Sequence, residues 1–156
     1  MDPARKFAAQ GPSGAFPQQR SIFVIDDTPE ALDLYRTVFE MEGYEVHTAS
    51  NGNDALAMLS QIAPPSLILS DIRMGEMSGP EFLVVLERDF PDIFAQVPVV
   101  FLTGLSVVPE TKAASVLHKP VDINELLESV DRLIKASANR RTTGTKDSGE
   151  DPGNLL

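Results

Sequence analysis

The sequence has no cysteine and no long apolar run. Without cysteine there can be no disulfide, no zinc–thiolate site and no thiol nucleophile, and such a composition fits a reducing compartment. No apolar stretch approaches the roughly 20 residues that a membrane-spanning helix needs. Residues 1–20 also lack the apolar core of a signal peptide. We therefore expect a soluble cytoplasmic protein with no membrane segment.

Basic residues are scarce as well. The chain has 13 Lys and Arg against 23 Asp and Glu, a formal net charge of −10. Binding to DNA or RNA needs clustered Lys and Arg to neutralise phosphates, so nucleic acid is not an expected partner. One basic pair, Arg140 and Arg141, lies in a polar stretch and is best interpreted as a solubility feature.

The length of 156 residues fits one domain with tails, and 42% hydrophobic residues can form its core. Residues 1–19 combine prolines and glycines without periodicity, which predicts a disordered leader. Residues 137–156 are rich in Ser, Thr, Gly and Asp, which predicts a disordered polar tail. The folded domain is predicted over residues 20–136.

Short apolar runs alternate with helical patterns inside this domain. The helical patterns include Leu32, Tyr35 and Phe39 at helical spacing, and a long apolar stripe that begins at Ile123. The apolar runs show no alternation of polarity, which is typical of strands buried on both faces. This order predicts a doubly wound α/β domain, a five-stranded parallel sheet with helices on both faces. The predicted strands are 22–25, 44–47, 67–69, 98–102 and 115–118.

Polar side chains stand at the ends of four of these strands. Asp26 and Asp27 follow the first strand, Asp71 follows the third, Thr103 ends the fourth, and Lys119 follows the fifth. Taken singly, each could be an ordinary loop or helix-capping residue. In a doubly wound sheet, however, ligands bind at the carboxyl ends of the strands. Five suitable residues at four such ends therefore predict a functional site.

The predicted site has a clear chemical requirement. Three carboxylates at close range repel one another, and a hard divalent cation relieves that repulsion. Mg²⁺ binds carboxylate and phosphate oxygens, so it would also organise an incoming phosphoryl group. A carboxylate can attack phosphorus, and a hydroxyl and an ammonium group can then bind the phosphoryl oxygens. The set indicates Mg²⁺-assisted phosphoryl chemistry.

Several segments resemble the receiver domain of bacterial response regulators, the phosphoacceptor module of two-component signal transduction. They are FVIDDTPEALDLYRTVFEMEGYEVHTASNGNDAL, LILSDIRMGEMSGPEFL, PVVFLTG and VLHKPVDINELLESV, and together they cover about residues 22–134. The resemblance implies the flavodoxin-like receiver fold. It also implies a phosphoprotein that takes part in a phosphorelay with a histidine kinase or phosphotransfer protein.

The resemblance assigns roles to the residues at the strand ends. Asp71 would be the phosphoacceptor and a metal ligand. Asp26 and Asp27 would be the acidic pair that binds Mg²⁺, with Asp27 as the direct ligand. The backbone carbonyl of Arg73 would complete the protein's share of the metal shell.

The same resemblance implies how the phosphoryl group is held. Thr103 would bind one phosphoryl oxygen and act as the switch hydroxyl. Lys119 would pair with the phosphoryl group, and the Lys119-Pro120 peptide bond would be cis.

The chain departs from the family pattern in four places. Residues 74–76 read Met-Gly-Glu where the family often has Met-Pro-Gly. The stretch 104–114 is short for the helix that normally lies between the last two strands, so the fourth helix should be short or absent. Val116 stands where the switch aromatic usually lies, and Val121 stands where a Phe often follows Lys-Pro. These departures concern the face used for output more than the phosphoacceptor.

Two functions remain open from the sequence. The chain could be a stand-alone response regulator, monomeric or weakly dimeric, in which phosphorylation of Asp71 alters a contact with a downstream protein. It could also be a pseudoreceiver, which keeps the fold and signals without phosphorylation. A phosphatase-like hydrolase would need a second catalytic Asp soon after the nucleophile and a substrate cap, and neither is evident. We therefore do not expect a turnover enzyme.

Overall fold

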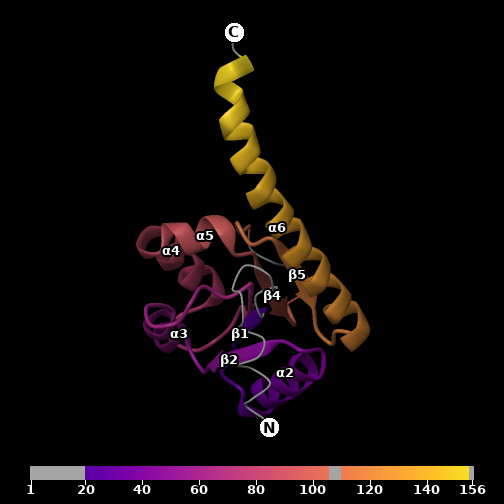
Figure 1. The fold of residues 1–156 in the computed structure, drawn as a ribbon. Helices are drawn as coiled ribbons and strands as arrows, with labels where there is room; N and C mark the ends of the chain where they lie inside the picture. Colours follow the sequence, from indigo (N-terminus) through magenta and orange to yellow (C-terminus); the bar gives the residue numbers. More distant parts are fainter. Residues whose placement is uncertain (1–19, 106–109, 155–156) are drawn as a thin grey trace, which may run out of the picture.

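The computed structural model describes residues 20–105 and 110–154, with side chains described as far as residue 139. The chain forms one parallel sheet with the strand order β2-β1-β3-β4-β5 (Figure 1). This is the predicted five-stranded sheet. Its strands are β1 (Ser21–Ile25), β2 (Glu45–Ala49), β3 (Leu67–Asp71), β4 (Val99–Thr103) and β5 (Ser115–His118).

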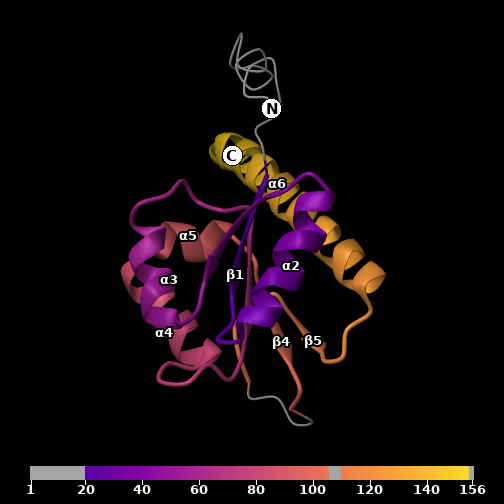
Figure 2. The same ribbon diagram turned by 90° about the horizontal axis from the view of Figure 1, so that it is seen from below.

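Helices cover both faces of the sheet, as expected for a doubly wound domain (Figure 2). One core layer packs α3, α4 and α5 against side chains such as Phe23, Ile68 and Phe101. The other packs α2 and α6 against side chains such as Val24 and Leu102. The helices are α2 (Pro29–Met41), α3 (Gly52–Leu59), α4 (Gly79–Asp89), α5 (Pro91–Gln96) and α6 (Ile123–Asn154).

Local signals in the sequence set the starts of three helices. Pro29 occupies the first turn of α2, where its fixed φ suits a helix and its missing N–H is not needed. The Asp122 carboxylate accepts a hydrogen bond from the Glu125 amide at 3.1 Å and so caps the start of α6. Ser78 and Glu81 form a reciprocal capping box at α4, which was not predicted from the sequence.

The connection between β4 and β5 has no helix in its described residues, 104–105 and 110–114. This agrees with the expectation that the fourth helix is short or absent. The residues before β5 are held in other ways: the Ala114 amide donates to the Val99 carbonyl at 2.8 Å, and Lys112 pairs with Glu87 of α4 at 3.1 Å. The connection between β3 and β4 instead carries two helices, because Pro91 starts the short helix α5 after α4 ends.

The C-terminal boundary predicted from composition is wrong by at least one residue. Ser137 is only 2% exposed, and its hydroxyl donates to the Gln96 carbonyl at 2.7 Å, so it belongs to the folded domain. The backbone of α6 continues to Asn154, where composition predicts a disordered tail (Figure 1). Extending a formed helix is far easier than starting one, because the costly nucleus already exists. The predicted leader, residues 1–19, lies outside the described residues.

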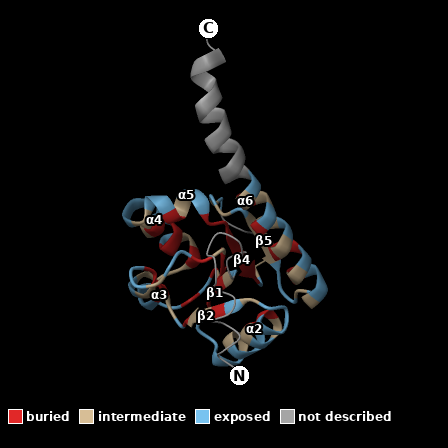
Figure 3. Cartoon of the chain, viewed as in Figure 1, coloured by how far each residue is buried: buried red, intermediate tan, exposed pale blue. Residues whose placement is uncertain are grey.

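Burial follows the two-layer arrangement. The strands are mostly buried, and the exposed residues lie mainly on the helices and loops (Figure 3). Among the described residues, no helix is both long enough and apolar enough to cross a lipid bilayer. Few polar residues are buried among the described residues, and two of them, Asp26 and Thr103, lie at the carboxyl ends of strands.

Candidate functional site

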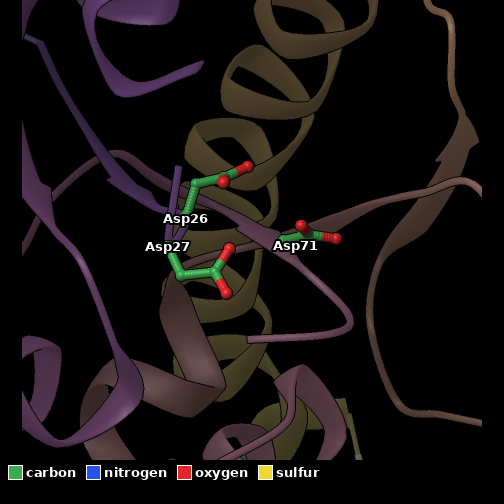
Figure 4. A group of neighbouring side chains, drawn as sticks. All are labelled: Asp26, Asp27 and Asp71. Carbon is green, nitrogen blue, oxygen red and sulfur yellow. The ribbon is translucent and has the colours of Figure 1, made fainter. Parts of the chain in front are cut away.

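Three carboxylates meet at the carboxyl end of the sheet. Asp26 and Asp27 follow β1, Asp71 ends β3, and these two strands are neighbours. Each residue offers one carboxylate oxygen, and these three oxygens all lie within 4.8 Å of one another (Figure 4). The sequence predicted this convergence because parallel neighbouring strands end at one edge of the sheet.

Lys119 brings a positive charge to the same place. Its ammonium nitrogen lies 3.3 Å from Asp71 Oδ2 and 3.8 Å from Asp26 Oδ2. The Lys119-Pro120 peptide bond is cis, as the resemblance implied. The predicted partnership of Lys119 with the acids of the first and third strands is therefore present in the structure.

Asp26 is the most buried of the three acids, with 2% exposure. Burial raises its pKa above the ordinary value, and the neighbouring Asp71 adds to this, while the Thr28 amide and Lys119 oppose it. The Thr28 N–H donates to Asp26 Oδ1 at 2.9 Å. The other carboxylate oxygen, Oδ2, has Lys119 as its charged neighbour.

The charge of Lys119 is stabilised by its surroundings. Partial burial disfavours its ammonium form, but the carboxylates of Asp71 and Asp26 outweigh this effect and hold the pKa of Lys119 above its ordinary value. Lys119 is therefore a permanent cation at neutral pH, suited to binding an anionic oxygen.

Thr103 is buried at the end of β4, one residue beyond the register partner of Asp71. Its hydroxyl accepts a hydrogen bond from the Leu105 amide at 2.9 Å. Its carbonyl accepts one from the Lys119 amide at 2.7 Å. The structure thus places Thr103 between the strand that carries Asp71 and the segment that carries Lys119.

The loop after Asp71 is held tightly against α4. The Gly79 amide donates to the Ile72 carbonyl at 2.7 Å, and a Cβ at Gly79 would lie 2.7 Å from the Asp71 carbonyl oxygen. Only glycine allows this approach. Arg73 lies in this loop with its side chain exposed to solvent. Its predicted metal ligand is the backbone carbonyl, so the position of the side chain is compatible with that prediction.

One neighbour of the site was not predicted. Tyr35 on α2 is 6% exposed, and its phenol lies within electrostatic reach of Lys119, Asp26 and Asp71. In the sequence, Tyr35 shows only helical spacing with Leu32 and Phe39. Such spacing does not show which residue of a helix interacts with a distant site.

The residues at the site fit a hard divalent cation. Its donors are carboxylate oxygens, which Mg²⁺ prefers, and one of the three acids is buried where an unpaired charge is costly. A cation held by Asp26, Asp27 and Asp71 would offset their mutual repulsion. Lys119 and Thr103 lie beside this position as possible donors to an anion.

Comparisons with known proteins give a consistent result. A family model described as the response regulator receiver domain matches residues 22–131. The transcriptional regulatory protein GlrR of Escherichia coli is 32% identical over 123 residues, which are 75% of this chain and 27% of that protein. The chain spans little more than a quarter of the length of several curated relatives that it matches.

A second relative is similar over most of its own length. An uncharacterized 14.6 kDa protein of Leptolyngbya boryana is 36% identical over 124 residues, which are 76% of this chain and 92% of that protein. Among solved structures, the chemotaxis response regulator CheY4 of Vibrio cholerae superimposes with a TM-score of 0.66 at 28% identity. The match covers 74% of this chain and 99% of CheY4.

Proposed function

The chain belongs to the response regulator receiver domain family, and on this basis we propose that it takes a phosphoryl group onto Asp71 from a histidine kinase or phosphotransfer protein. The observation that carries the proposal is the meeting of Asp26, Asp27 and Asp71 with the Lys119 ammonium. This is the charge pattern that an aspartyl phosphate requires: acids for a metal, and a cation for the phosphoryl oxygens.

In the proposed transfer, an oxygen of the Asp71 carboxylate attacks phosphorus as the bond from phosphorus to the donor's imidazole nitrogen breaks. The imidazole leaves and takes up a proton from solvent. Mg²⁺, when bound, neutralises charge on the acids and on the transferring group. Asp26, Asp27, Asp71 and the Arg73 carbonyl would hold it. Lys119 would move only a short distance from Asp71 to a phosphoryl oxygen.

Thr103 would provide the hydroxyl for another phosphoryl oxygen. Its position beside the register partner of Asp71 supports this role. Because its hydroxyl already accepts a hydrogen bond from the Leu105 amide, its own proton is available to donate elsewhere.

The proposed output is a change in a protein–protein contact in the cytoplasm, by a stand-alone receiver that is monomeric or weakly dimeric. The relative from Leptolyngbya boryana supports the stand-alone form, because the match spans 92% of that protein. Phosphorylation would shift a two-state equilibrium by stronger Thr103 and Lys119 contacts. The proposed activity is a switch with slow loss of its own phosphoryl group, and not a turnover enzyme.

A second candidate is a pseudoreceiver that signals without phosphorylation. Two observations favour it. Val116 replaces the usual switch aromatic, and the described residues between β4 and β5 contain no helix. Both affect the usual output face and leave the acidic site intact, so we rank this candidate second.

The test is incubation with Mg²⁺ and acetyl phosphate, followed by intact-mass measurement. The wild-type chain should gain one phosphoryl group, and Asp71→Asn should gain none. Asp92→Asn, an exposed acid on α5, is the matched control and should behave as wild type. Absence of a gain in the wild type, both with acetyl phosphate and with a phosphorylated histidine donor, would favour the pseudoreceiver. Turnover of many donor molecules per chain would indicate a hydrolase.

A further inference from the structure

Ser70 is a buried polar side chain that the function proposed above does not use. It precedes the acceptor Asp71 on β3 and is 1% exposed. Because side chains alternate along a strand, Ser70 faces the same core layer as Ile68, the layer that α3, α4 and α5 cover. A hydroxyl in an apolar layer is costly unless it makes a hydrogen bond, so the bond that Ser70 makes indicates its role.

The hydroxyl of Ser70 is directed into the loop that follows β3. It donates to the Asp71 carbonyl oxygen at 2.8 Å, and the sulfur of Met74, a weaker acceptor, lies 3.7 Å from it. Helix α4 approaches the same carbonyl, because a Cβ at Gly79 would lie 2.7 Å from its oxygen. The carbonyl of Asp71 is therefore enclosed between the Ser70 hydroxyl and the start of α4.

The peptide group that Ser70 holds also reaches the acceptor carboxylate. The carbonyl of Asp71 and the amide of Ile72 belong to one planar, rigid peptide unit. The Ile72 amide donates to Asp71 Oδ1 at 2.7 Å. A rotation of this unit would move its carbonyl and its amide together. The bond from Ser70 to the carbonyl therefore restrains the amide that holds Oδ1.

The other carboxylate oxygen of Asp71 is left to face Lys119. Asp71 Oδ2 lies 3.3 Å from the Lys119 ammonium nitrogen, the group that the proposed function assigns to the phosphoryl oxygens. Oδ2 is thus the oxygen beside the position of an arriving phosphoryl group. A nucleophile reacts fast only when it is held close to the geometry of attack, and a displacement of about 1 Å can cost about a hundredfold in rate.

We propose that Ser70 is a positioning residue of the phosphoacceptor, and that its hydroxyl holds the peptide unit between Asp71 and Ile72 so that Oδ2 attacks phosphorus. The inference rests on the function proposed above. In the transfer, Oδ2 forms its bond to phosphorus as the bond from phosphorus to the donor's imidazole nitrogen breaks, and the imidazole takes up a proton from solvent. Oδ1 keeps its bond to the Ile72 amide throughout. Ser70 acts through the backbone and does not touch the phosphoryl group.

The test compares wild type, Ser70→Ala and Ser137→Ala with acetyl phosphate at saturating Mg²⁺, and follows the phosphorylation rate by intact mass. Ser137→Ala is a matched control, because Ser137 is 2% exposed and its hydroxyl donates to the backbone carbonyl of Gln96 at 2.7 Å. Each variant loses one buried hydroxyl bond, but the acceptor is loosened in Ser70→Ala alone. Ser70→Ala should be phosphorylated about tenfold more slowly, and Ser137→Ala should match wild type.

Amide NMR in the absence of a phosphodonor reports on the peptide unit itself. The Ile72 amide proton donates to a carboxylate, so it should resonate downfield in wild type and Ser137→Ala and shift upfield in Ser70→Ala. In wild type, the hydroxyl proton of Ser70 should exchange slowly with water, since its bond is enclosed.

A second pair of variants covers the case in which Ser70→Ala does not fold. Threonine and valine have nearly the same shape, and threonine alone keeps the hydroxyl. Ser70→Thr should therefore be phosphorylated faster than Ser70→Val, and its Ile72 amide proton should resonate further downfield.

The outcomes separate the two proposals. The positioning role is wrong, and the proposed function stands, if wild type is phosphorylated and Ser70→Ala matches it in rate or in the Ile72 shift. Equal slowing in Ser137→Ala, equal behaviour of Ser70→Thr and Ser70→Val, or fast exchange of the Ser70 hydroxyl proton would contradict the role in the same way. If wild type gains no phosphoryl group from any donor, the proposed function is overturned and the role of Ser70 with it.

Discussion

The ammonium group of Lys119 lies 3.3 Å from a carboxylate oxygen of Asp71, a residue 48 positions earlier in the chain. The contact joins the loop after β5 to the end of β3, although β4 lies between these strands. It provides an anion-binding cation beside the acceptor before any phosphoryl group arrives.

Lys119→Met should weaken beryllofluoride binding about tenfold or more, because the phosphoryl oxygens lose a charge-assisted partner. The affinity can be measured by NMR titration in the presence of Mg²⁺. Lys112→Met is the matched control, since Lys112 is exposed and pairs with Glu87 on α4. Equal loss of affinity in both variants would show that general charge, rather than the position of Lys119, controls binding.

Asp26→Asn should stabilise the metal-free protein at neutral pH. The pKa of Asp26 is raised in the folded state, so its neutral form is favoured there. The contribution of this group to stability is therefore fully present below the unfolded pKa, near 3.8, and is lost as pH rises through the raised folded pKa. An asparagine keeps the neutral form at every pH. Urea unfolding in EDTA at several pH values measures the difference, which should shrink toward low pH.

Mg²⁺ should stabilise wild type more than it stabilises Asp26→Asn. At about ten times its Kd, the cation should stabilise wild type by about 1.4 kcal/mol, since it binds only the folded state. Asp26→Asn should gain much less, because one carboxylate of the cluster is gone. Thermal unfolding with and without Mg²⁺ gives both values, and Ca²⁺-free EDTA samples provide the baseline. A gain of equal size in the variant would exclude Asp26 from the cation site.

Gly79→Ala should destabilise the fold by about 2 kcal/mol and disturb Asp71. The new Cβ would lie 2.7 Å from the Asp71 carbonyl oxygen and 2.9 Å from Phe101 Cε1, so the start of α4 must move away from β3. Gly104→Ala is the control, as a Cβ there meets nothing within 4 Å. Urea unfolding gives the stability of each variant, and the rate of phosphorylation by acetyl phosphate reports on Asp71. A Gly79→Ala protein as stable as Gly104→Ala would contradict the close approach.

Ser137→Ala should cost about 1 kcal/mol of stability, because the Gln96 carbonyl loses the buried Ser137 hydroxyl that donates to it at 2.7 Å. Ser60→Ala provides a comparison. The Ser60 hydroxyl makes a bond of the same length to the Ala57 carbonyl, but the contact is exposed and its loss should cost less than about 0.5 kcal/mol. Chemical denaturation measures both. Equal effects would mean that α6 is not docked on α5 at Ser137.

The sequence predicts the sheet and the acidic site well because both depend on simple regularities. Apolar runs without alternation predict buried parallel strands, and each polar residue at a strand end is then assigned to one edge. Asp26, Asp71 and Lys119 meet for this reason. The short or absent helix before β5 was also predictable, since the stretch before Ser115 is short, and the described residues of that stretch contain no helix.

Other features depend on contacts that no local pattern shows. The break between α4 and α5 could have been predicted from Pro91, which marks a new helix start, but its hydrogen bonds appear only in the fold. Ser137 looks like part of a polar tail until α6 brings it to Gln96. Tyr35 has the spacing of a core residue, and its electrostatic interactions with Lys119, Asp26 and Asp71 become visible only in the fold.

The two hydrogen bonds of Thr103 have a mechanical consequence. The Leu105 amide donates to its hydroxyl and the Lys119 amide donates to its carbonyl. Thr103 thus links the segment that follows β4 to the segment that follows β5. A displacement of Thr103 would therefore act on both segments together. Such a link does not require a switch aromatic, whose usual position is occupied here by Val116. It would connect the phosphoacceptor site to the surface through backbone hydrogen bonds.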